Sequence, residues 1–297
     1  DLAGLIARAS TGVNNAWVSN PVPDTTTSNG DDPAGNGTGD AAGNGAAMHH
    51  GNGNGNGHPL VDLAFTKAAA AGSGLAAFTL EGVRIRVFGG AQDGVGKCAL
   101  GGEIQVLKAR NSAGRWVGGH VGKSFAYGAQ SGLFLIQGDA DARAGIRLSG
   151  ADIVLGGEPA GPLNDRLGTL AARANCKGFA FEYMTGGRAV VLGDPGPWLC
   201  SGMTGGVVYI RQNADWGLDA AAVRRRLSKA AKVSLAALED ADIANVVDLL
   251  GRYQEALRGG EQDETADALQ PLIDDPAEHF ISVNPVTQQA DPNISTE

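Results

Sequence analysis

The sequence predicts a mainly β protein: a right-handed parallel β-helix, or solenoid, of about six coils, followed by a small α-helical C-terminal extension. The first observation is a repeat in which small or glycine pairs precede β-rich runs at Gly82, Gly102, Gly132, Gly150, Gly187 and Gly206. Three of the five separations are 18 to 20 residues, which is typical of one stacked unit. The second observation is a change to helical periodicity after Tyr209.

Composition narrows the class of protein. A chain of 297 residues holds one or two domains, and 46 of them are Gly. The 23 Lys and Arg against 32 Asp and Glu give a charge of −9, which argues against a surface that binds nucleic acid. The sequence has neither a long apolar run nor a signal-peptide pattern, so we expect no membrane partner and a cytoplasmic location.

The N-terminal part lies outside the expected core. Residues 1–23 are predicted to form a linker, because prolines follow its short apolar stretch. Residues 24–58 contain ten Gly and six Asn with almost no large apolar residue, so we expect a disordered segment. Its histidines, His49, His50 and His58, are interpreted as incidental, since a floppy tether does not hold metal ligands in place.

Residues 69–213 are assigned to the β-helix domain. The run from Val83 to Val87 alternates apolar and charged residues with period two, as a half-buried strand does. The run Leu133 to Ile136 is wholly apolar, which predicts that both strand faces are covered and that another domain or chain packs outside. Glycines are predicted at the corners, where stacked backbones leave no room for a side chain: Gly82, Gly101, Gly102, Gly132, Gly150, Gly186, Gly187, Gly205 and Gly206.

Residues 214–297 are assigned to the helical extension and tail. From Asp240 the apolar residues follow i, i+3, i+4, i+7 spacing for about 18 residues, which predicts an amphipathic helix. A second helix is expected over roughly 264–273, and an extended segment over 279–286. The run Arg224 to Arg226 is interpreted as a solvated face rather than an anion site.

The sequence contains few candidates for catalytic or ligand-binding residues. The segment "GVGK" lacks the P-loop spacing, because Cys98 stands where Ser or Thr is needed. His120 has no sequence support as a catalytic base, and Asp139 and Asp141 are expected to bond their own backbone at a corner. The cysteines, Cys98, Cys176 and Cys200, lie far apart and form no C-x-x-C motif. We therefore predict no catalytic, cofactor-binding or metal residue in this chain.

Four residues are candidates for an interface with a partner: Phe134, Glu182, Tyr183 and Trp198. Phe134 belongs to the apolar run, and Glu182 is expected to pair with a basic residue of a neighbouring coil or domain. Widely spaced aromatic residues are more typical of interface anchors or core residues than of a sugar-binding platform.

Several motifs resemble the C-terminal region of the glutamate synthase large subunit, the domain named for its G-X-G-X-G pattern. They are "GAQDGVGKCALGGEIQVL", "SGLFLIQGDADARAGIRLSGADIVLGG", "FEYMTGGRAVVLG" and "CSGMTGGVVYI", within roughly 71–285. The Gly/Asn run and the insertion from Glu158 to Lys177 depart from that pattern and indicate a divergent or stand-alone relative.

The resemblance implies a non-catalytic structural domain or subunit that positions catalytic domains in glutamate biosynthesis and nitrogen metabolism. Its expected partners are an FMN-binding synthase domain with an iron-sulfur cluster and a glutamine amidotransferase domain, so both cofactors would belong to a partner chain or domain. The same solenoid is also similar to the C subunit of formylmethanofuran dehydrogenase and to formyltransferase/hydrolase relatives. A third alternative is an independent β-solenoid enzyme or glycan-binding protein.

Overall fold

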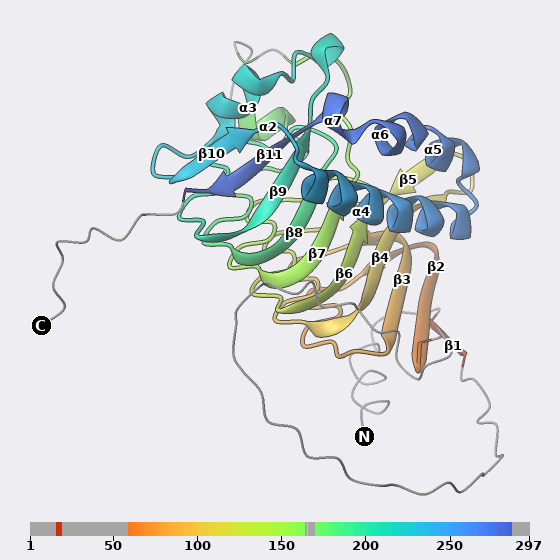
Figure 1. Ribbon diagram of the computed structural model, residues 1–297. Coiled ribbons are helices and arrows are strands. Elements are labelled where there is room, and N and C mark those ends of the chain that lie inside the picture. The colour runs from red at the N-terminus through yellow and green to blue at the C-terminus, as the bar shows by residue number, and fades with distance from the viewer. Residues whose placement is uncertain (1–15, 20–58, 164, 166–169, 287–297) are drawn as a thin grey trace, which may run out of the picture.

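One large, mostly parallel sheet organises the chain in the computed structural model, which describes residues 16–19, 59–163, 165 and 170–286. Within these residues the sheet order is β1-β2-β3-β4-β6-β7-β8-β9-β11-β10, with β5 paired to β4 off this path (Figure 1). Neighbours from β2 to β9 are parallel, whereas β1, β11 and β10 pair antiparallel at the two ends. The strands are β1 (Ala16–Ser19), β2 (Val61–Ala71), β3 (Val83–Ala91), β4 (Leu100–Arg110), β5 (Trp116–Gly118), β6 (Ser131–Ile136), β7 (Ser149–Leu155), β8 (Thr185–Val191), β9 (Gly205–Arg211), β10 (Val233–Ala236) and β11 (Phe280–Pro285).

Most of the helices follow the last parallel strand. They are α2 (Leu170–Arg173), the 3-10 helix η1 (Ala214–Trp216), α3 (Ala220–Arg226), α4 (Asp240–Gly259), α5 (Asp263–Asp267), α6 (Gln270–Asp274) and α7 (Pro276–His279). Among the described helices, none is long and apolar enough to cross a membrane. Figure 1 shows α4 lying across the outer face of the sheet, with α5 to α7 beyond it.

Strand β3 follows the alternation that the sequence predicts. Val83, Ile85 and Val87 are buried, while Arg84 and Arg86 lie on the outer face. Arg84 Nε donates to Glu103 Oε2 at 3.1 Å, and Arg86 pairs with both oxygens of Asp62 at 3.1 and 3.0 Å. At this end of the sheet, ion pairs between neighbouring strands occupy the outer face.

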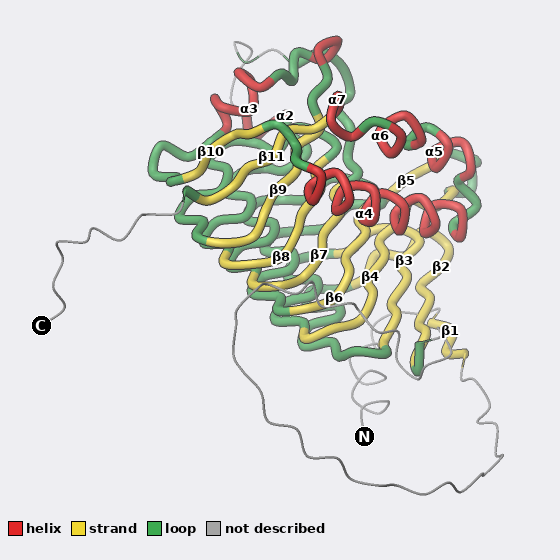
Figure 2. The backbone as a smooth tube through the Cα atoms, in the orientation of Figure 1, coloured by secondary structure: helices red, strands yellow, loops and turns green. Residues whose placement is uncertain are grey.

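Among the described residues, six five-residue turns link the strands and stack on one another beside the sheet (Figure 2). We call them the turn stack: residues 74–78, 94–98, 124–128, 143–147, 179–183 and 198–202. The first, third and fifth residues of every turn have positive φ. Their amides donate to carbonyls of adjacent repeats, as from Arg143 to Gly178 at 2.8 Å and from Phe181 to Ala144 at 2.7 Å. The turns therefore satisfy their backbone groups without forming strands.

From β4 to β9 the sheet is covered on both faces. On the inner face, its side chains pack against buried turn residues, with the rings of Phe125 and Phe134 edge to face at 5.5 Å. On the outer face, α4 presents Val246, Leu250 and Tyr253 to the strands from β4 to β9. The apolar run of β6 is thus covered by this chain's own helix, which corrects the expectation that another domain or chain covers it.

Polar contacts fix α4 on the sheet. Arg188 of β8 donates to Asp152 of β7 at 2.9 and 2.6 Å, to Asp248 at 3.0 Å and to Asn245 at 2.7 Å. At the start of the helix, Tyr209 Oη donates to Asp242 Oδ1 at 2.9 Å. The helix therefore has a defined position as well as an apolar contact.

Beyond α4, a buried amide pair ties the chain to the sheet. The side chains of Gln137 and Gln262 exchange hydrogen bonds with each other, and Gln262 also donates to the Lys108 carbonyl at 3.3 Å. This contact holds the residue before α5 against the ends of β4 and β6.

The predicted right-handed parallel β-helix of about six coils is wrong. In the described part of the chain, regular strand pairing runs along one mixed sheet, with β5 beside β4 and helices on the outer face. The return path consists of turns and isolated bridges. The physical reason lies in the turn stack: residues that alternate between left-handed and other conformations cannot form the extended strands that further sides of a prism need. A 19-residue repeat therefore supplies one strand and one compact return segment.

Two of the three elements predicted after residue 239 are present in the structure. The amphipathic helix from Asp240 is confirmed as α4, and the extended tail as β11. The second predicted helix is instead two short ones, α5 and α6. The disordered segment 24–58, with its histidines, and most of the linker 1–23 lie outside the described residues. Only residues 16–19 of that linker are described, and they form β1.

Candidate functional site

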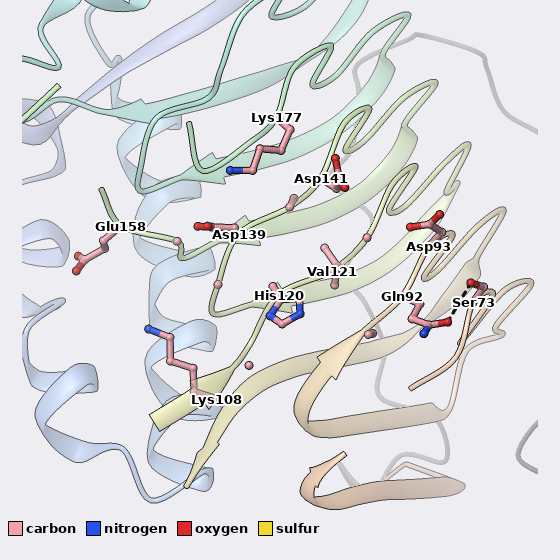
Figure 3. Close-up of a pocket in the computed structure, with 16 residues that line it drawn as sticks. Ser73, Gln92, Asp93, Lys108, His120, Val121, Asp139, Asp141, Glu158 and Lys177 are labelled. Carbon is pink, nitrogen blue, oxygen red and sulfur yellow. Dashed lines mark hydrogen bonds between the residues drawn. The ribbon is translucent and has the colours of Figure 1, made fainter. Parts of the chain in front are cut away.

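An open polar groove of about 690 Å³ follows the ends of β3, β4, β6 and β7. Figure 3 shows His120 near its middle, Asp93 and Asp141 toward one side, and Lys108 and Glu158 toward the other. Its charged and titratable lining residues are Asp93, Lys108, His120, Asp139, Asp141, Glu158 and Lys177. The groove is therefore mixed in charge, with carboxylates in excess.

Glycines make this surface hollow. A Cβ on Gly157 would lie 2.5 Å from Asp139 Oδ1 and 2.8 Å from the Gly138 carbonyl oxygen. A Cβ on Gly138 would lie 2.8 Å from the carbonyl of Gly119. Because successive backbones approach this closely, only glycine fits, and polar side chains stand on either side.

Two of the groove's aspartates, Asp93 and Asp139, bond residues of later repeats, and Asp141 bonds locally. Asp93 Oδ1 accepts from the Lys123 amide at 2.8 Å, and Asp141 Oδ1 accepts from the amide of the next residue at 2.6 Å. Asp139 Oδ1 accepts from Asn175 Nδ2 at 2.7 Å. Asp141 thus bonds its own backbone as expected, whereas Asp139 bonds a side chain instead.

Glu158 and Lys177 also bond other residues of the chain. Glu158 pairs with Arg211 at 3.0 Å, and Lys177 Nζ donates to the Ala174 carbonyl at 3.0 Å. His120 is exposed and lies over Gly90, where a Cβ would be 3.1 Å from its ring. Within the described part of the chain, no group of three His, Cys, Asp or Glu is placed to hold a metal ion. The groove can offer hydrogen bonds to a polar segment.

The cysteines do not fit an iron-sulfur cluster. Cys176 and Cys200 are fully buried, and burial raises the pKa of both thiols. For Cys176, the neighbouring charges of Asp194 and Asp139 raise the pKa further. Cys98 is partly exposed in the turn stack. Because the described residues bring no three such ligands together, we derive no chemistry through a cluster in this chain.

The "GVGK" segment belongs to the turn stack. The backbone amides of Gly94, Gly96 and Cys98 donate to backbone carbonyls at 2.7 to 2.8 Å. The acceptors are the carbonyl oxygens of Lys123, Leu75 and Tyr127, respectively. A phosphate cradle needs such amides to point at the ligand. Here they hold neighbouring repeats together.

A buried ionic cluster lies beside the groove, where Asn175 bonds both Asp139 and the Asp194 amide. Arg224 and Arg225 are exposed, as the sequence suggested, but Arg226 is buried. Arg226 is 1% exposed and donates to both oxygens of Asp194 at 2.5 and 2.7 Å. It also donates to Asp165 at 3.0 Å. Burial alone raises the pKa of Asp165, but bonds and charge from Arg226 and Arg225 outweigh this, so the pKa lies below its ordinary value.

The structure separates the predicted interface residues. Phe134 is fully buried in the inner core, which removes it from the candidate interface. Glu182 is 3.9 Å from Arg143 of the preceding turn. Tyr183 and Trp198 are 50% and 49% exposed in the last two turns. Their side chains are therefore available to a partner.

The predicted corner glycines lie at strand starts. Gly82, Gly102, Gly132, Gly187 and Gly206 have positive φ. At the others, Gly101, Gly150, Gly186 and Gly205, a Cβ would collide with the preceding repeat's backbone. Sequence reasoning missed the first, third and fifth residues of each turn in the turn stack, which have positive φ. Glycine at positions i, i+2 and i+4 would mark such a turn, but glycine occupies only some of these positions.

Comparisons with known proteins identify the family. The GXGXG motif family matches residues 42–162 and 167–285, well over half of the chain. Ferredoxin-dependent glutamate synthase 2, chloroplastic, of Arabidopsis thaliana is 36% identical over 151 residues, which are 50% of this chain and 8% of that protein. The glutamate synthase [NADPH] large chain of Bacillus subtilis is 36% identical over 152 residues, 50% of this chain and 9% of that one.

These matches confirm the resemblance that the glycine motifs indicated. The matched region is less than a tenth of the length of either relative, so most of each relative has no counterpart in this chain. The chain belongs to the GXGXG motif family, as a glutamate-synthase-like member of it.

Proposed function

We propose that this chain is a non-catalytic structural domain or subunit of a glutamate-synthase-like oxidoreductase complex and positions its catalytic parts. The partners would be an FMN-binding synthase domain with an iron-sulfur cluster and a glutamine amidotransferase domain. They would carry out glutamine amide transfer in glutamate biosynthesis, and they would hold both cofactors. We include the cytoplasmic location expected from the sequence in this proposal.

The observation that carries the proposal is how the polar side chains are used. In the groove, Asp93 bonds the backbone amide of Lys123 and Asp139 bonds the side chain of Asn175, both in later repeats. Beside the groove, Arg226 bonds two aspartates, Asp165 and Asp194. Groups of this kind are employed in holding repeats together, which suits a rigid spacer. Family membership and the small share of the relatives' length support the same interpretation.

The test is purification of the full tagged chain from its own cells at low salt, with mass spectrometry and a visible absorption spectrum. A strain expressing the tag alone is the control. We expect a stoichiometric flavoprotein with iron-sulfur absorption to accompany the chain and to remain in the soluble fraction. A colourless chain without a partner would contradict the proposal. A metal-containing amidohydrolase as partner would replace it with the formyl-transfer alternative.

A further inference from the structure

The outer positions of the turn stack form two columns along the molecule. The first column holds the first residue of each turn: Gly74, Gly94, Ser124, Arg143, Phe179 and Trp198. The last column holds the fifth residue: Phe78, Cys98, Gly128, Arg147, Tyr183 and Gly202. Hydrogen bonds between successive turns keep both columns in register, for example from Arg147 to Glu182 and from Tyr183 to Ser201, each at 2.7 Å.

Large side chains occupy these columns in the last three turns. Arg143, Arg147, Phe179, Tyr183 and Trp198 all have φ between 54° and 66°, a conformation that disfavours residues with a Cβ. Glycine fills the first column in the first two turns, so the backbone itself does not require a side chain there. Large side chains that gather in this conformation over successive turns indicate a shared role outside the fold, whereas Phe78 is the one large side chain of both columns in the first three turns.

Contacts run along each column of these five residues, which we together call the aromatic-arginine patch. The rings of Phe179 and Trp198 stack with centroids 4.6 Å apart and planes at 15°. The Arg143 guanidinium lies 5.9 Å from the Phe179 ring, and that of Arg147 lies 5.9 Å from the Tyr183 ring. The Arg143 side chain is 57% exposed, and Tyr183 and Trp198 are about half exposed. Rings and cations are therefore both presented to solvent in a fixed arrangement.

The chemistry of the patch defines what it fits. Trp, Tyr and Arg are the residues enriched where protein partners gain most of their binding energy. Two arginines against the single carboxylate of Glu182 make the patch locally positive on a chain of charge −9. Guanidinium groups bind carboxylates in a planar, two-point geometry, and the ring faces beside them bury apolar side chains.

We propose that the aromatic-arginine patch docks a protein surface that presents carboxylates beside an apolar side chain, on the flavin-bearing catalytic partner. This inference rests on the proposed function and names the face through which the chain meets that partner. Tyr183 and Trp198 supply the apolar contact, and Arg143 and Arg147 the charged one.

The experiment uses the full chain and the flavoprotein isolated with it. The variants are Tyr183→Gly, Trp198→Gly and the charge reversal Arg143→Glu/Arg147→Glu. Glycine tolerates the same φ, so the first two remove side chains without straining the turn. The matched control is Phe78→Gly, which removes an equally left-handed aromatic residue that is 64% exposed in the first turn. Circular dichroism and melting temperature establish that each variant folds.

We expect Tyr183→Gly, Trp198→Gly and the charge reversal each to weaken binding about tenfold or more, and Phe78→Gly to change it by less than about twofold. The charge reversal should also abolish most of the dependence of binding on salt. If Trp198→Gly alone fails to fold, the charge reversal at the exposed arginines decides the question.

Two results overturn the inference while the proposed function stands. One is a wild-type chain that binds the flavoprotein while all folded patch variants bind within about twofold of it. The other is an equal or larger loss in Phe78→Gly, which would place the docking face at the opposite end of the turn stack. A wild-type chain that binds no flavoprotein contradicts the proposed function itself, and the patch inference with it.

Discussion

Gly96 occupies the third position of the second turn, with φ of 66°, and a Cβ there would overlap the buried ring of Phe134. We expect Gly96→Ala to destabilise the chain by about 2 to 4 kcal/mol, because left-handed strain and overpacking add. Urea unfolding followed by circular dichroism measures the loss. An unchanged midpoint would show that the inner core can move away from the turn.

The matched control for this substitution is Gly251→Ala. Gly251 lies inside α4, where an added Cβ meets nothing within 4 Å. Alanine should stabilise the helix by about 0.5 to 1 kcal/mol, since glycine is the weaker helix former. A loss of unfolding free energy at Gly96 together with a gain at Gly251 would show that glycine is required for steric reasons at Gly96. It would exclude a general effect of replacing glycine by alanine.

Asp165 provides a pH-dependent prediction. Its pKa lies below the ordinary value of 3.8, so its bonds to Arg225 and Arg226 stabilise the fold above that pH and are lost as the pH falls through the folded pKa. We expect Asp165→Asn to lower the free energy of unfolding by about 1 kcal/mol at pH 7 and by progressively less below about pH 4. Denaturant unfolding across this pH range tests it.

Asp267→Asn is the control for that prediction, because Asp267 pairs with Arg258 on the surface and is 70% exposed. We expect no measurable change in the free energy of unfolding there at any of these pH values. A loss in Asp165→Asn that persists undiminished at pH 3 would mean that a contact other than the ionised pair is responsible.

At the residue scale, the sequence predicted strand positions better than turn positions. The alternation from Val83 to Val87 was sufficient to assign β3 and its buried face. The turn stack was not recognised, because Arg, Phe, Tyr and Trp occupy positions that glycine would mark. Backbone bonds to the adjacent turns hold those residues in place, and a single sequence does not display such long-range bonds.

At the scale of elements, α4 is the cover of the outer face, and adjacent valines test it. Val246 is fully buried against the sheet, whereas Val247 is 37% exposed. We expect Val246→Ala to cost about 2 kcal/mol, from the lost burial and the cavity left behind. Val247→Ala should change the free energy of unfolding by less than about 0.5 kcal/mol. Urea midpoints of the two variants measure the difference, and similar losses in both would contradict this placement of α4.

The existence of α4 could be predicted from its amphipathic period, but its partner could not. The apolar run of β6 required a cover, and the sequence left open which segment supplies it. The structure supplies it from the same chain, through contacts such as Leu250 against the strands and Arg188 with Asp248. The buried Arg226 was missed for a similar reason, since its partners Asp165 and Asp194 are distant in sequence.

At the scale of the whole molecule, the glycine spacing predicted stacked repeats. It did not predict which part of each repeat forms a strand and which part forms a turn. A repeat length sets how much chain each layer contains, and it does not say how much of that chain is extended. The compact turns shorten the return path, so the strands gather into one mostly parallel sheet. The family resemblance, by contrast, could be recognised directly from motifs such as "EYMTGG", which depend on local sequence alone.

The uneven cover of this sheet predicts a gradient of local stability. Strands β6 and β7 are buried on both faces over most of their length, whereas β2 keeps many partly exposed residues on its outer face. Amide hydrogens open with free energies that follow such burial. We expect peptides from β6 and β7 to exchange at least about tenfold more slowly than those from β2, measured by hydrogen exchange with mass spectrometry on the isolated chain. Equal protection of β2 would mean that a further segment or a second molecule covers its outer face, and repeating the measurement at tenfold dilution distinguishes the two, because only protection by a second molecule depends on concentration.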